Sequence, residues 1–283
     1  MVSLRPLLLA LPLLGLVACG GGGSGGPERA PFTGPHFLGA LTMEVSGSGF
    51  TTPGVVWADF LPAGDGTADA DVWGARDGLE EPLGTGPLTY ELLPDGTVRL
   101  LDLVSSGGCL SESGRVALLG REASDDDDAL LTCILRCAGT YDDRSLTGDY
   151  HVCGLFDEFS AASFWGQMRF DGAGAIEIGS VVHSYGDTRN TESSGGSGSY
   201  GVEPGGRFQM TIDPVAHYQA GAGKLQGGIL ENGDAFCAVG ATDDVPLESM
   251  VFGFPVGTGM NAASLEGTYA VFGIDSKGRT VSG

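Results

Sequence analysis

The sequence predicts an all-β protein with two tandem eight-stranded antiparallel up-and-down meanders, each closed into a barrel. Three observations support this fold class. Gly accounts for 50 of the 283 residues, and because Gly is unfavourable inside helices, a mainly helical protein is excluded. A set of short segments recurs along the chain in one order. Within each repeat, alternating apolar residues are separated by turn signals, which is typical of half-buried strands.

The first 18 residues are predicted to be a signal peptide. Arg5 precedes an apolar stretch, Leu7 to Ala18, that is too short to span a bilayer as a helix. The stretch ends in Leu16-Val17-Ala18-Cys19-Gly20, with small residues before the cysteine, and this pattern resembles the lipobox of bacterial lipoproteins. An ordinary secretory signal that contains a cysteine is the alternative.

The lipobox resemblance implies that Cys19 becomes the lipidated first residue of the mature chain. In that family a residue other than Asp after the cysteine implies passage to the outer membrane, and Gly20 fits this route. Residues 19–34 are rich in Gly and form a flexible tether that holds the folded part off the membrane. We therefore expect a lipid-anchored protein of the cell outer membrane that faces either the periplasm or the cell surface.

The internal repeat defines the domains. Segments that begin at Phe37, Leu146 and Leu265 share an apolar-x-Gly opening. Three further correspondences follow in the same order: Val56–Phe60 with Phe164–Met168, Leu88–Gly96 with Ser199–Gly206, and Gly107–Gly114 with Gly227–Gly233. We predict a first barrel unit at residues 35–139, a second at 140–264, and the start of a third, incomplete repeat at 265–283.

Each unit contains eight candidate strands. In the second unit they are Gly148–Leu155, Ser163–Phe170, Ala175–His183, Gly198–Glu203, Arg207–Ile212, Lys224–Leu230, Asp234–Ala241 and Ser249–Val256. Tight-turn sequences such as Asp171–Gly174 and Pro94–Gly96 join neighbouring strands in antiparallel order. Because eight sequential strands leave two exposed edges unless the sheet closes, a closed barrel is favoured, and an open β-sandwich is the alternative.

Large apolar residues recur at every second position of several strands, so one face of each strand is predicted to be buried. The candidate inward set of the second unit comprises Tyr150, Met168, Phe170, Tyr200, Phe208, Met210, Met250, Phe252 and Phe254. An eight-stranded barrel is just wide enough to be filled by side chains or to hold one small ligand. This many large side chains would fill it.

The repeat opening Leu146-x-Gly148-x-Tyr150, followed by an eight-stranded meander, resembles the calycin group, which contains lipocalins and avidins. Their first strand carries a Gly-x-Trp motif, and here Tyr150 and Tyr269 stand at the Trp position, with Leu41 in the first unit. The resemblance implies a barrel fold and, for function, a carrier of a small apolar ligand. It transfers no ligand-binding residue to this chain.

The charge balance excludes one class of partner. The chain has 36 acidic and 14 basic residues, a formal charge of -22, which repels nucleic acid. Acidic runs recur at Asp125–Asp128 and Asp243–Asp244, which raises the possibility of a Ca²⁺ site. The alternating ligand spacing of a calcium loop is lacking, so solvated hairpin tips are favoured and no cofactor or metal is expected.

Five cysteines follow the lipobox: Cys109, Cys133, Cys137, Cys153 and Cys237. An oxidising compartment favours disulfides. At strand rise, Cys133 and Cys137 are about 13 Å apart, too far to bond each other. We predict a Cys153–Cys237 bridge in the second unit and a bridge from Cys109 to Cys133 or Cys137 in the first. Zinc bound by Cys133, Cys137, His151 and Cys153 is the alternative, although this spacing matches no known finger or ribbon pattern.

The sequence indicates a protein without enzymatic activity. The four histidines, His36, His151, His183 and His217, show no spacing that pairs them with a nucleophile, and no phosphate loop or dinucleotide fingerprint is present. Two function classes remain. The favoured one is a surface-displayed structural or interaction module with an unknown protein partner, and the alternative is a carrier of a small apolar ligand.

Overall fold

The computed structural model describes residues 31–43, 54–76, 79–101, 106–111, 113–121, 129–157, 161–185, 191–193, 195–213, 223–242, 248–257, 272–274 and 280–282. Within these ranges the regular elements are strands, apart from the short 3₁₀ turns η2 (Asp143–Ser145) and η3 (Glu231–Gly233). None of the described segments is a helix with the length and apolarity needed to cross a membrane.

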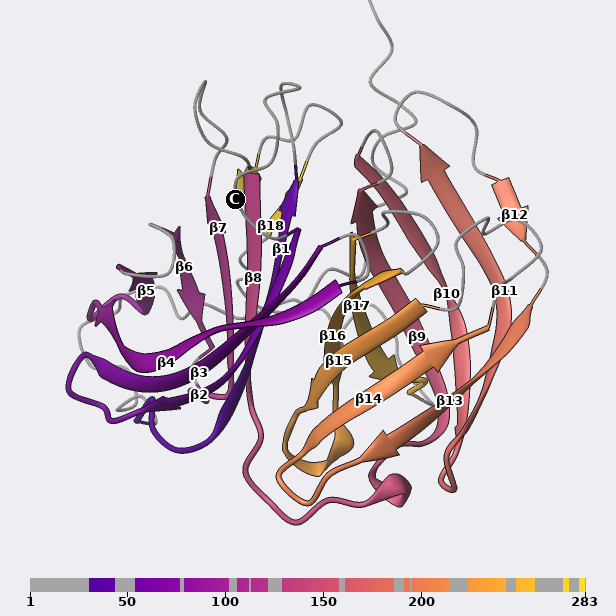
Figure 1. The fold of residues 1–283 in the computed structure, drawn as a ribbon, viewed down its shortest axis with the longest axis horizontal. Coiled ribbons are helices and arrows are strands. Elements are labelled where there is room, and N and C mark those ends of the chain that lie inside the picture. The colour runs from indigo at the N-terminus through magenta and orange to yellow at the C-terminus, as the bar shows by residue number, and fades with distance from the viewer. Residues whose placement is uncertain are drawn as a thin grey trace, which may run out of the picture.

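Eight strands form a closed antiparallel barrel in the first half of the chain, here called barrel 1 (Figure 1). They are β1 (His36–Met43), β2 (Val55–Pro62), β3 (Thr67–Arg76), β4 (Leu79–Leu92), β5 (Thr97–Leu100), β6 (Ser106–Leu110), β7 (Val116–Arg121) and β8 (Ala129–Arg136). Each strand pairs with the next, and β8 pairs back onto β1 from Arg136 opposite His36 to Ala129 opposite Met43. This last pairing closes the barrel.

The second half repeats the arrangement as barrel 2. Its strands are β9 (Thr147–Asp157), β10 (Ala161–Asp171), β11 (Ala175–Tyr185), β13 (Gly196–Val202), β14 (Arg207–Ile212), β15 (Gly223–Ile229), β16 (Phe236–Thr242) and β17 (Glu248–Pro255). Closure comes from β17 pairing with β9, while the short β12 (Thr191–Ser193) adds to β11 alone. The predicted fold class of two tandem closed barrels is confirmed, and the open sandwich is wrong.

The duplication is visible in the turns. The amide N–H of Tyr90 donates to the carbonyl of Gly66 at 2.9 Å, and the N–H of Tyr200 donates to Gly174 at 2.8 Å. Gly66 and Gly174 have φ values of +94° and +105°, which favour glycine, so each repeat uses the same residue type at the same turn.

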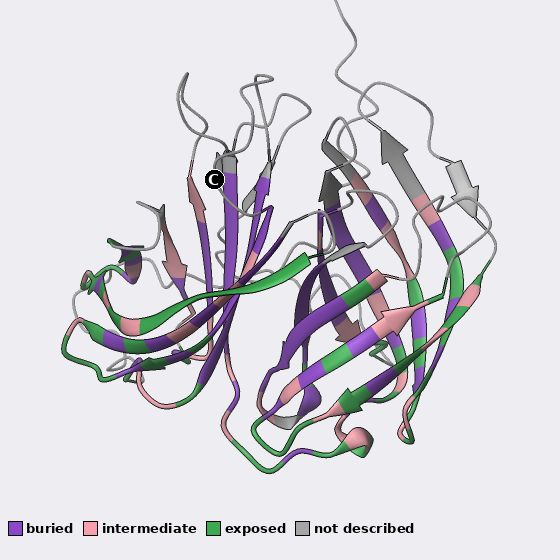
Figure 2. Ribbon diagram, viewed as in Figure 1, coloured by how far each residue is buried: buried purple, intermediate pink, exposed green. Residues whose placement is uncertain are grey.

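Side chains from all eight strands of each barrel converge on its interior, and we call these two interiors lumen 1 and lumen 2. Lumen 1 contains Phe32, Leu38, Ala40, Ala58, Phe60, Ala68, Ala70, Val72, Tyr90, Val98, Leu100, Leu110, Ala117, Leu119, Leu130 and Ile134. Lumen 2 includes Tyr150, Val152, Phe164, Met168, Phe170, Ile176, Ile178, Tyr200, Phe208, Met210, Leu225, Phe236, Ala238 and Val251. Buried positions run along both barrels in Figure 2.

A third buried cluster lies between the barrels, and we call it the seam. It joins the outward faces of β1, β2 and β8 to those of β9, β16 and β17. Its members include Phe37, Leu41, Val55, Trp57, Leu131, Cys133, Leu135 and Cys137 from barrel 1, and Cys153, Leu155, Cys237, Val239, Met250 and Phe252 from barrel 2. Apolar side chains therefore fill the space between the two barrels.

The seam corrects one prediction. Met250 and Phe252 were expected in the lumen, but they belong to the seam, and the partly buried Phe254 packs against it. Val251 is the residue of β17 that faces lumen 2. The alternating pattern correctly predicts a strand here, but it assigns the wrong face of that strand to the lumen, because both faces of β17 are buried.

Several predicted segments fall wholly or partly outside the described residues. They are the signal peptide at 1–18, the tether as far as residue 30, and the opening strand of the third repeat at 265–271. Barrel 1 packing begins at Phe32, within the predicted tether, since its ring is buried in lumen 1. Near the C-terminus, β18 (Phe272–Ile274) pairs with β19 (Thr280–Ser282) and contacts β7 and β8.

Candidate functional site

Lumen 2 is the place where a carrier would hold a ligand, and it is occupied by aromatic rings. The Phe236 ring lies at the centre of the group, with centroid distances of 5.7 Å to Tyr150, 5.6 Å to Phe170 and 5.5 Å to Phe208. Most of these contacts are edge-to-face, the arrangement that aromatic quadrupoles favour. The rings stabilise one another in the space that a ligand would need.

The exposure of these side chains shows how tightly the lumen is packed. Phe170, Phe208 and Phe236 are 1 %, 2 % and 1 % exposed. An open lumen would leave its lining in contact with an internal space of at least water size, and these rings have almost no such contact. Six of the nine predicted inward residues are confirmed in lumen 2: Tyr150, Met168, Phe170, Tyr200, Phe208 and Met210.

One end of barrel 2 is closed by the segment that connects the barrels. Tyr141 from this segment is buried in the same cluster as lumen 2. The Tyr200 hydroxyl lies 2.9 Å from the carbonyl oxygens of Asp143 and Leu146, to which it donates (Asp143 opens η2). Burial raises the pKa of Tyr200, so the hydroxyl stays protonated as a donor. The connecting segment is therefore part of barrel 2 packing.

Lumen 1 is filled differently. Phe32, which precedes β1, inserts its ring at 4.8 Å from the His36 ring, 5.3 Å from Tyr90 and 6.0 Å from Phe60. Tyr90 accepts a hydrogen bond from the Gly64 amide at 3.0 Å through its hydroxyl oxygen. Much of the remaining wall is alanine, so this lumen is filled by smaller side chains and one inserted ring.

His36 is the histidine best placed to serve as a base inside a barrel, and its surroundings argue against that role. It is 3 % exposed, and its Nδ1–H donates to the Gly34 carbonyl at 2.8 Å. Burial lowers the pKa of His36 to about 4, so the ring is neutral at pH 7. A general base must reach a substrate proton, whereas this ring is enclosed by Phe32 and Phe60.

The other histidines are dispersed. His151 is half-buried on β9 opposite Gln167 and Phe254, and His183 lies on β11 opposite Phe164. His217 falls outside the described residues. Among the described residues, no three His, Cys, Asp or Glu side chains lie close enough to hold a metal ion. The zinc alternative thus lacks support there, and both acidic runs considered for Ca²⁺ lie outside the described ranges.

The five cysteines that follow Cys19 are not joined by disulfide bonds in the structure. Cys153 and Cys237 both lie opposite Phe252, on the two strands that flank β17. Two strand spacings separate them by about 9.6 Å, beyond the Cα–Cα range of a disulfide. The register therefore does not fit the predicted Cys153–Cys237 bridge.

The predicted partners in the first unit are separated in a similar way. Cys109 and Cys133 lie on either side of Leu118, again two strands apart. Cys137 follows β8 and belongs to the seam with Cys133. Burial raises the pKa of both Cys137 and Cys153 to about 12, so these thiols stay protonated and are poor nucleophiles and metal ligands. Cys19, the predicted lipidation residue, lies outside the described residues.

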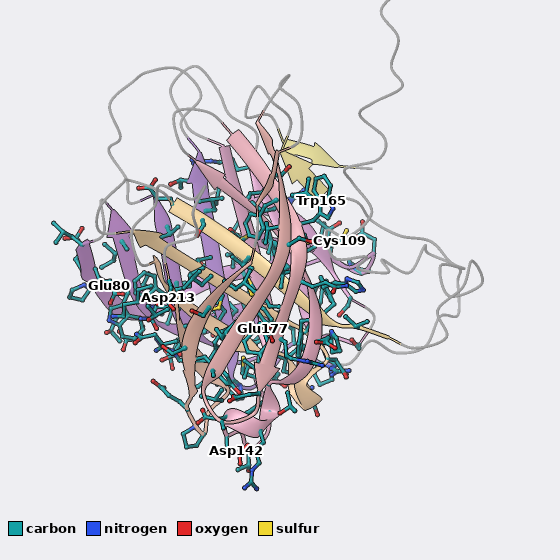
Figure 3. The ribbon with its side chains drawn as sticks, turned by 90° about the vertical axis from the view of Figure 1, so that its right-hand side faces the viewer. Glu80, Cys109, Asp142, Trp165, Glu177 and Asp213 are labelled. Carbon is teal, nitrogen blue, oxygen red and sulfur yellow. The ribbon has the colours of Figure 1, made fainter. Side chains whose placement is uncertain are left out.

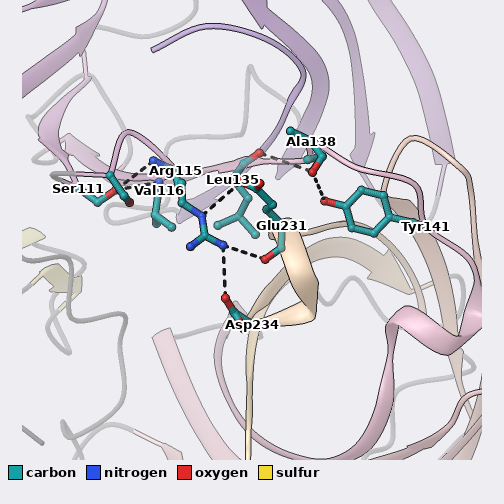
Figure 4. Close-up of polar contacts among 10 residues, drawn as sticks. Ser111, Arg115, Val116, Leu135, Ala138, Tyr141, Glu231 and Asp234 are labelled. Carbon is teal, nitrogen blue, oxygen red and sulfur yellow. Dashed lines mark hydrogen bonds and ion pairs between the residues drawn. The ribbon is translucent and has the colours of Figure 1, made fainter. Parts of the chain in front are cut away.

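Charged groups border the seam. Arg115 of barrel 1 donates through Nη2 to the Glu231 carbonyl at 2.8 Å and to Asp234 at 3.3 Å (Figure 4). Arg207 of barrel 2 pairs with Asp59 of barrel 1 at 3.0 Å. An apolar centre with a polar rim is the anatomy of a specific protein interface.

A further pair extends the rim along β4. Lys224 Nζ lies 3.1 Å from Glu80 Oε1, and Gln226 donates to the same oxygen at 3.4 Å; Figure 3 labels Glu80. Around this contact, residues 79–85 of β4 are all exposed, and Leu79 is 76 % exposed (Figure 2). The outside of the barrels is therefore where this molecule offers surface to other molecules.

The seam does not follow from alternating positions, although β8 carries a signal for it. Leu130, Leu131, Cys133, Ile134 and Leu135 are all buried, so this strand is apolar on both faces rather than on alternate positions. A continuous apolar run indicates a strand covered on two sides. That run distinguishes a strand within an interface from one that faces water.

Three solved structures resemble this chain at low sequence identity. No family model and no curated protein matches it. A mutant of the vaccine antigen transferrin-binding protein B (TbpB) from Haemophilus parasuis is 10 % identical, with a TM-score of 0.37, over 78 % of this chain and 45 % of that chain. A double mutant of the same antigen is 9 % identical, with a TM-score of 0.33, over 72 % and 53 % of the two chains.

A protein of unknown function from the DUF3598 family of Nostoc punctiforme is 10 % identical, with a TM-score of 0.26, over 79 % of this chain and 94 % of that chain. The chain spans about half the length of the TbpB structures. Identities of 9–10 % leave function to be argued from this chain's own residues.

Proposed function

We propose that this protein is a lipid-anchored, non-enzymatic display module of the outer membrane, in which two filled barrels act as one rigid interaction body. The observation that carries the proposal is the packing of both lumens by the protein's own side chains. Its partners contact the outside of the barrels, because the inside is occupied.

Rigidity supports the display role. The seam buries apolar residues of both barrels, and ion pairs from both halves border it. Inter-domain motion is the default only where the interface is small and polar, whereas this one has a large apolar centre. A partner would meet a single surface of fixed shape.

The surroundings of His36 and of two described cysteines are consistent with this role. In the described part of the chain, His36 is enclosed in lumen 1, and the Cys137 and Cys153 thiols stay protonated. A catalytic site needs a nucleophile or base within reach of a substrate and of its own orienting group. Display by a tether requires only the anchor and the rigid body.

The anchor is tested by replacing Cys19. Cys19→Ser should leave an uncleaved, unlipidated precursor that no longer partitions into detergent, while the matched control Cys109→Ser should mature normally, because Cys109 lies on β6 of barrel 1. Mass spectrometry of the N-terminal peptide measures cleavage and lipidation in both variants. Normal maturation and membrane retention of Cys19→Ser would show that the anchor is wrong.

The filled lumens are tested against the carrier alternative by native mass spectrometry of protein extracted from its membrane. We expect no stoichiometric small molecule and only weak, non-saturating binding of apolar fluorescent probes. One retained ligand per barrel, lost in Phe208→Asp but kept in the conservative Phe208→Leu, would establish a carrier instead.

A further inference from the structure

Two cysteines from different barrels meet in the seam. Cys133 lies on β8 of barrel 1 and Cys237 on β16 of barrel 2, and both are almost completely buried. After burial, the Cys133 thiol is the next cause of the raised pKa of Cys237, as expected for a near neighbour. The two strands themselves are in contact across the seam. Two buried thiols from different barrels therefore lie in one apolar cluster, on strands that contact each other.

Two glycines allow the backbones to approach at this point. Gly39 pairs with Cys133 across β1 and β8, and a Cβ on Gly39 would lie 3.1 Å from Cγ1 of Val239 on β16. Gly228 pairs with Cys237 across β15 and β16, and a Cβ on Gly228 would collide with the Phe37 side chain of β1. Each cysteine thus has a glycine as its cross-strand neighbour on the side that meets the other barrel.

Three other pairings are less favourable. The register separates Cys153 from Cys237, and Cys109 from Cys133, by two strand spacings, about 9.6 Å in each case. Cys137 follows Cys133 along the chain at about 13 Å by strand rise. Neither separation fits the Cα–Cα range of a disulfide.

We propose that Cys133 and Cys237 are a modification site at which a disulfide joins barrel 1 covalently to barrel 2. The oxidant is a disulfide, either of a protein oxidoreductase or of a small molecule such as oxidised glutathione. Two S–H bonds of the chain and the S–S bond of the oxidant break. One S–S bond forms between Cys133 and Cys237, and the oxidant leaves as two thiols, taking up both protons.

The bridge would hold the seam closed. It links residues about one hundred positions apart, and a loop of this length restricts the unfolded chain strongly. Its formation in the cell rests on the proposed function, since export past the inner membrane supplies the oxidising compartment. The chemistry of the site does not depend on export and is testable with purified protein.

The experiment is peptide mapping of the full chain, refolded from denaturant with oxidised glutathione and digested with trypsin without reductant. Arg136 separates Cys133 from Cys137, so each of the five cysteines lies in its own tryptic peptide. We expect one linked pair, Cys133 with Cys237, lost in Cys133→Ser and in Cys237→Ser but kept in the matched control Cys153→Ser. A linked pair that includes another cysteine, or five reduced thiols, would overturn the proposal.

A melting experiment provides a second readout that does not depend on digestion. Reduction should lower the Tm of the oxidised wild-type protein by about 5–10 °C and leave the Tm of Cys133→Ser unchanged. An equal fall in both proteins would overturn the proposal. If the Cys133–Cys237 pair forms in vitro while Cys19→Ser still matures normally, the modification site stands and the display function is wrong.

Discussion

The two barrels share a topology and the same turn chemistry, yet their lumens are filled by different means. When the two repeats are aligned by counting residues from their equivalent turn glycines, barrel 1 has small residues at positions where barrel 2 has large ones. The aligned pairs are Ala68 with Ile176, Ala70 with Ile178, Val98 with Phe208, and Ala117 with Phe236. Barrel 1 compensates with Phe32, which enters from outside the strand set.

This difference shows that strand order and core composition are separable. A closed eight-stranded barrel needs its interior filled to normal packing density, and either wall residues or an inserted ring meets that requirement. Tyr141 of the connecting segment packs at barrel 2 much as Phe32 packs at barrel 1. The comparison therefore predicts that exchanging large and small residues between the lumens destabilises the protein in both directions, through a cavity in barrel 2 and through overpacking in barrel 1.

The largest effect is expected for Phe236→Ala. The ring contacts Tyr150, Phe170 and Phe208, and its removal leaves a cavity that the closed barrel cannot collapse, which destabilises the protein by about 3–5 kcal/mol. Chemical denaturation measures the loss, with Phe236→Leu as a milder control. A loss below about 1 kcal/mol would show that lumen 2 is not packed as described.

The second-largest effect is expected in the stability of the protein at acid pH, because the titratable ring of His36 lies against lumen 1. The pKa of His36 falls from 6.5 to about 4 on folding, through burial and, to a smaller extent, the nearby Arg136. Between these pH values the unfolded chain binds a proton that the native chain does not, so stability decreases as the pH falls from 6.5 to 4. The total loss is roughly 3 kcal/mol.

The measurement compares the wild type with His36→Phe, whose ring cannot titrate. Carboxylates titrate in both proteins, so the difference between their pH profiles isolates His36. We expect the wild type to lose stability relative to the variant as the pH falls below 6.5, and to show a constant difference above it. Parallel profiles from pH 7 to pH 4 would contradict the enclosed state of His36.

A smaller effect is expected for the reciprocal change, Ala117→Phe. Ala117 lies between Leu110 and Ile134 in lumen 1 and is fully buried. An added ring must displace its neighbours, at a cost of about 1–3 kcal/mol. A stabilised variant would reveal unfilled volume in lumen 1 and would favour the carrier alternative for that barrel.

The smallest effect tests what holds the barrels together. Arg207 pairs with Asp59 and lies 5.1 Å from the centre of the Trp73 ring, but Asp59 is half exposed. A double-mutant cycle of Arg207→Met and Asp59→Asn should give a coupling energy below about 1 kcal/mol, weaker in high salt. A coupling above about 2 kcal/mol would mean that the ion pairs, rather than the apolar centre, stabilise the seam.

Much of the fold was predictable because the informative residues act locally. Turn glycines and alternating strands depend on neighbouring residues alone, and the strand β14 at Arg207–Ile212 matches its prediction at both ends. Because the segments recur, the strand pattern can be recognised in both halves of the sequence. The order of the strands then followed from the tight turns.

The seam could not be predicted from the same signals. Alternation shows that one face of a strand is buried, but it does not say whether a lumen or a neighbouring barrel covers that face. This is why Met250, Phe252 and Phe254 were placed inside barrel 2. Cysteine proximity is hidden from the sequence for a related reason, since Cys133 and Cys237 share the seam only because the two barrels pack against each other.

The seam also constrains how the two copies of the repeat diverge. Phe37 of one copy occupies the space left by Gly228 of the other, so a larger residue at one position is tolerated only with a smaller residue at its counterpart. Each barrel therefore supplies part of the packing environment of the other's outer face. A residue in the seam has to fit two barrels at once, whereas a residue in a lumen has to fit only its own barrel.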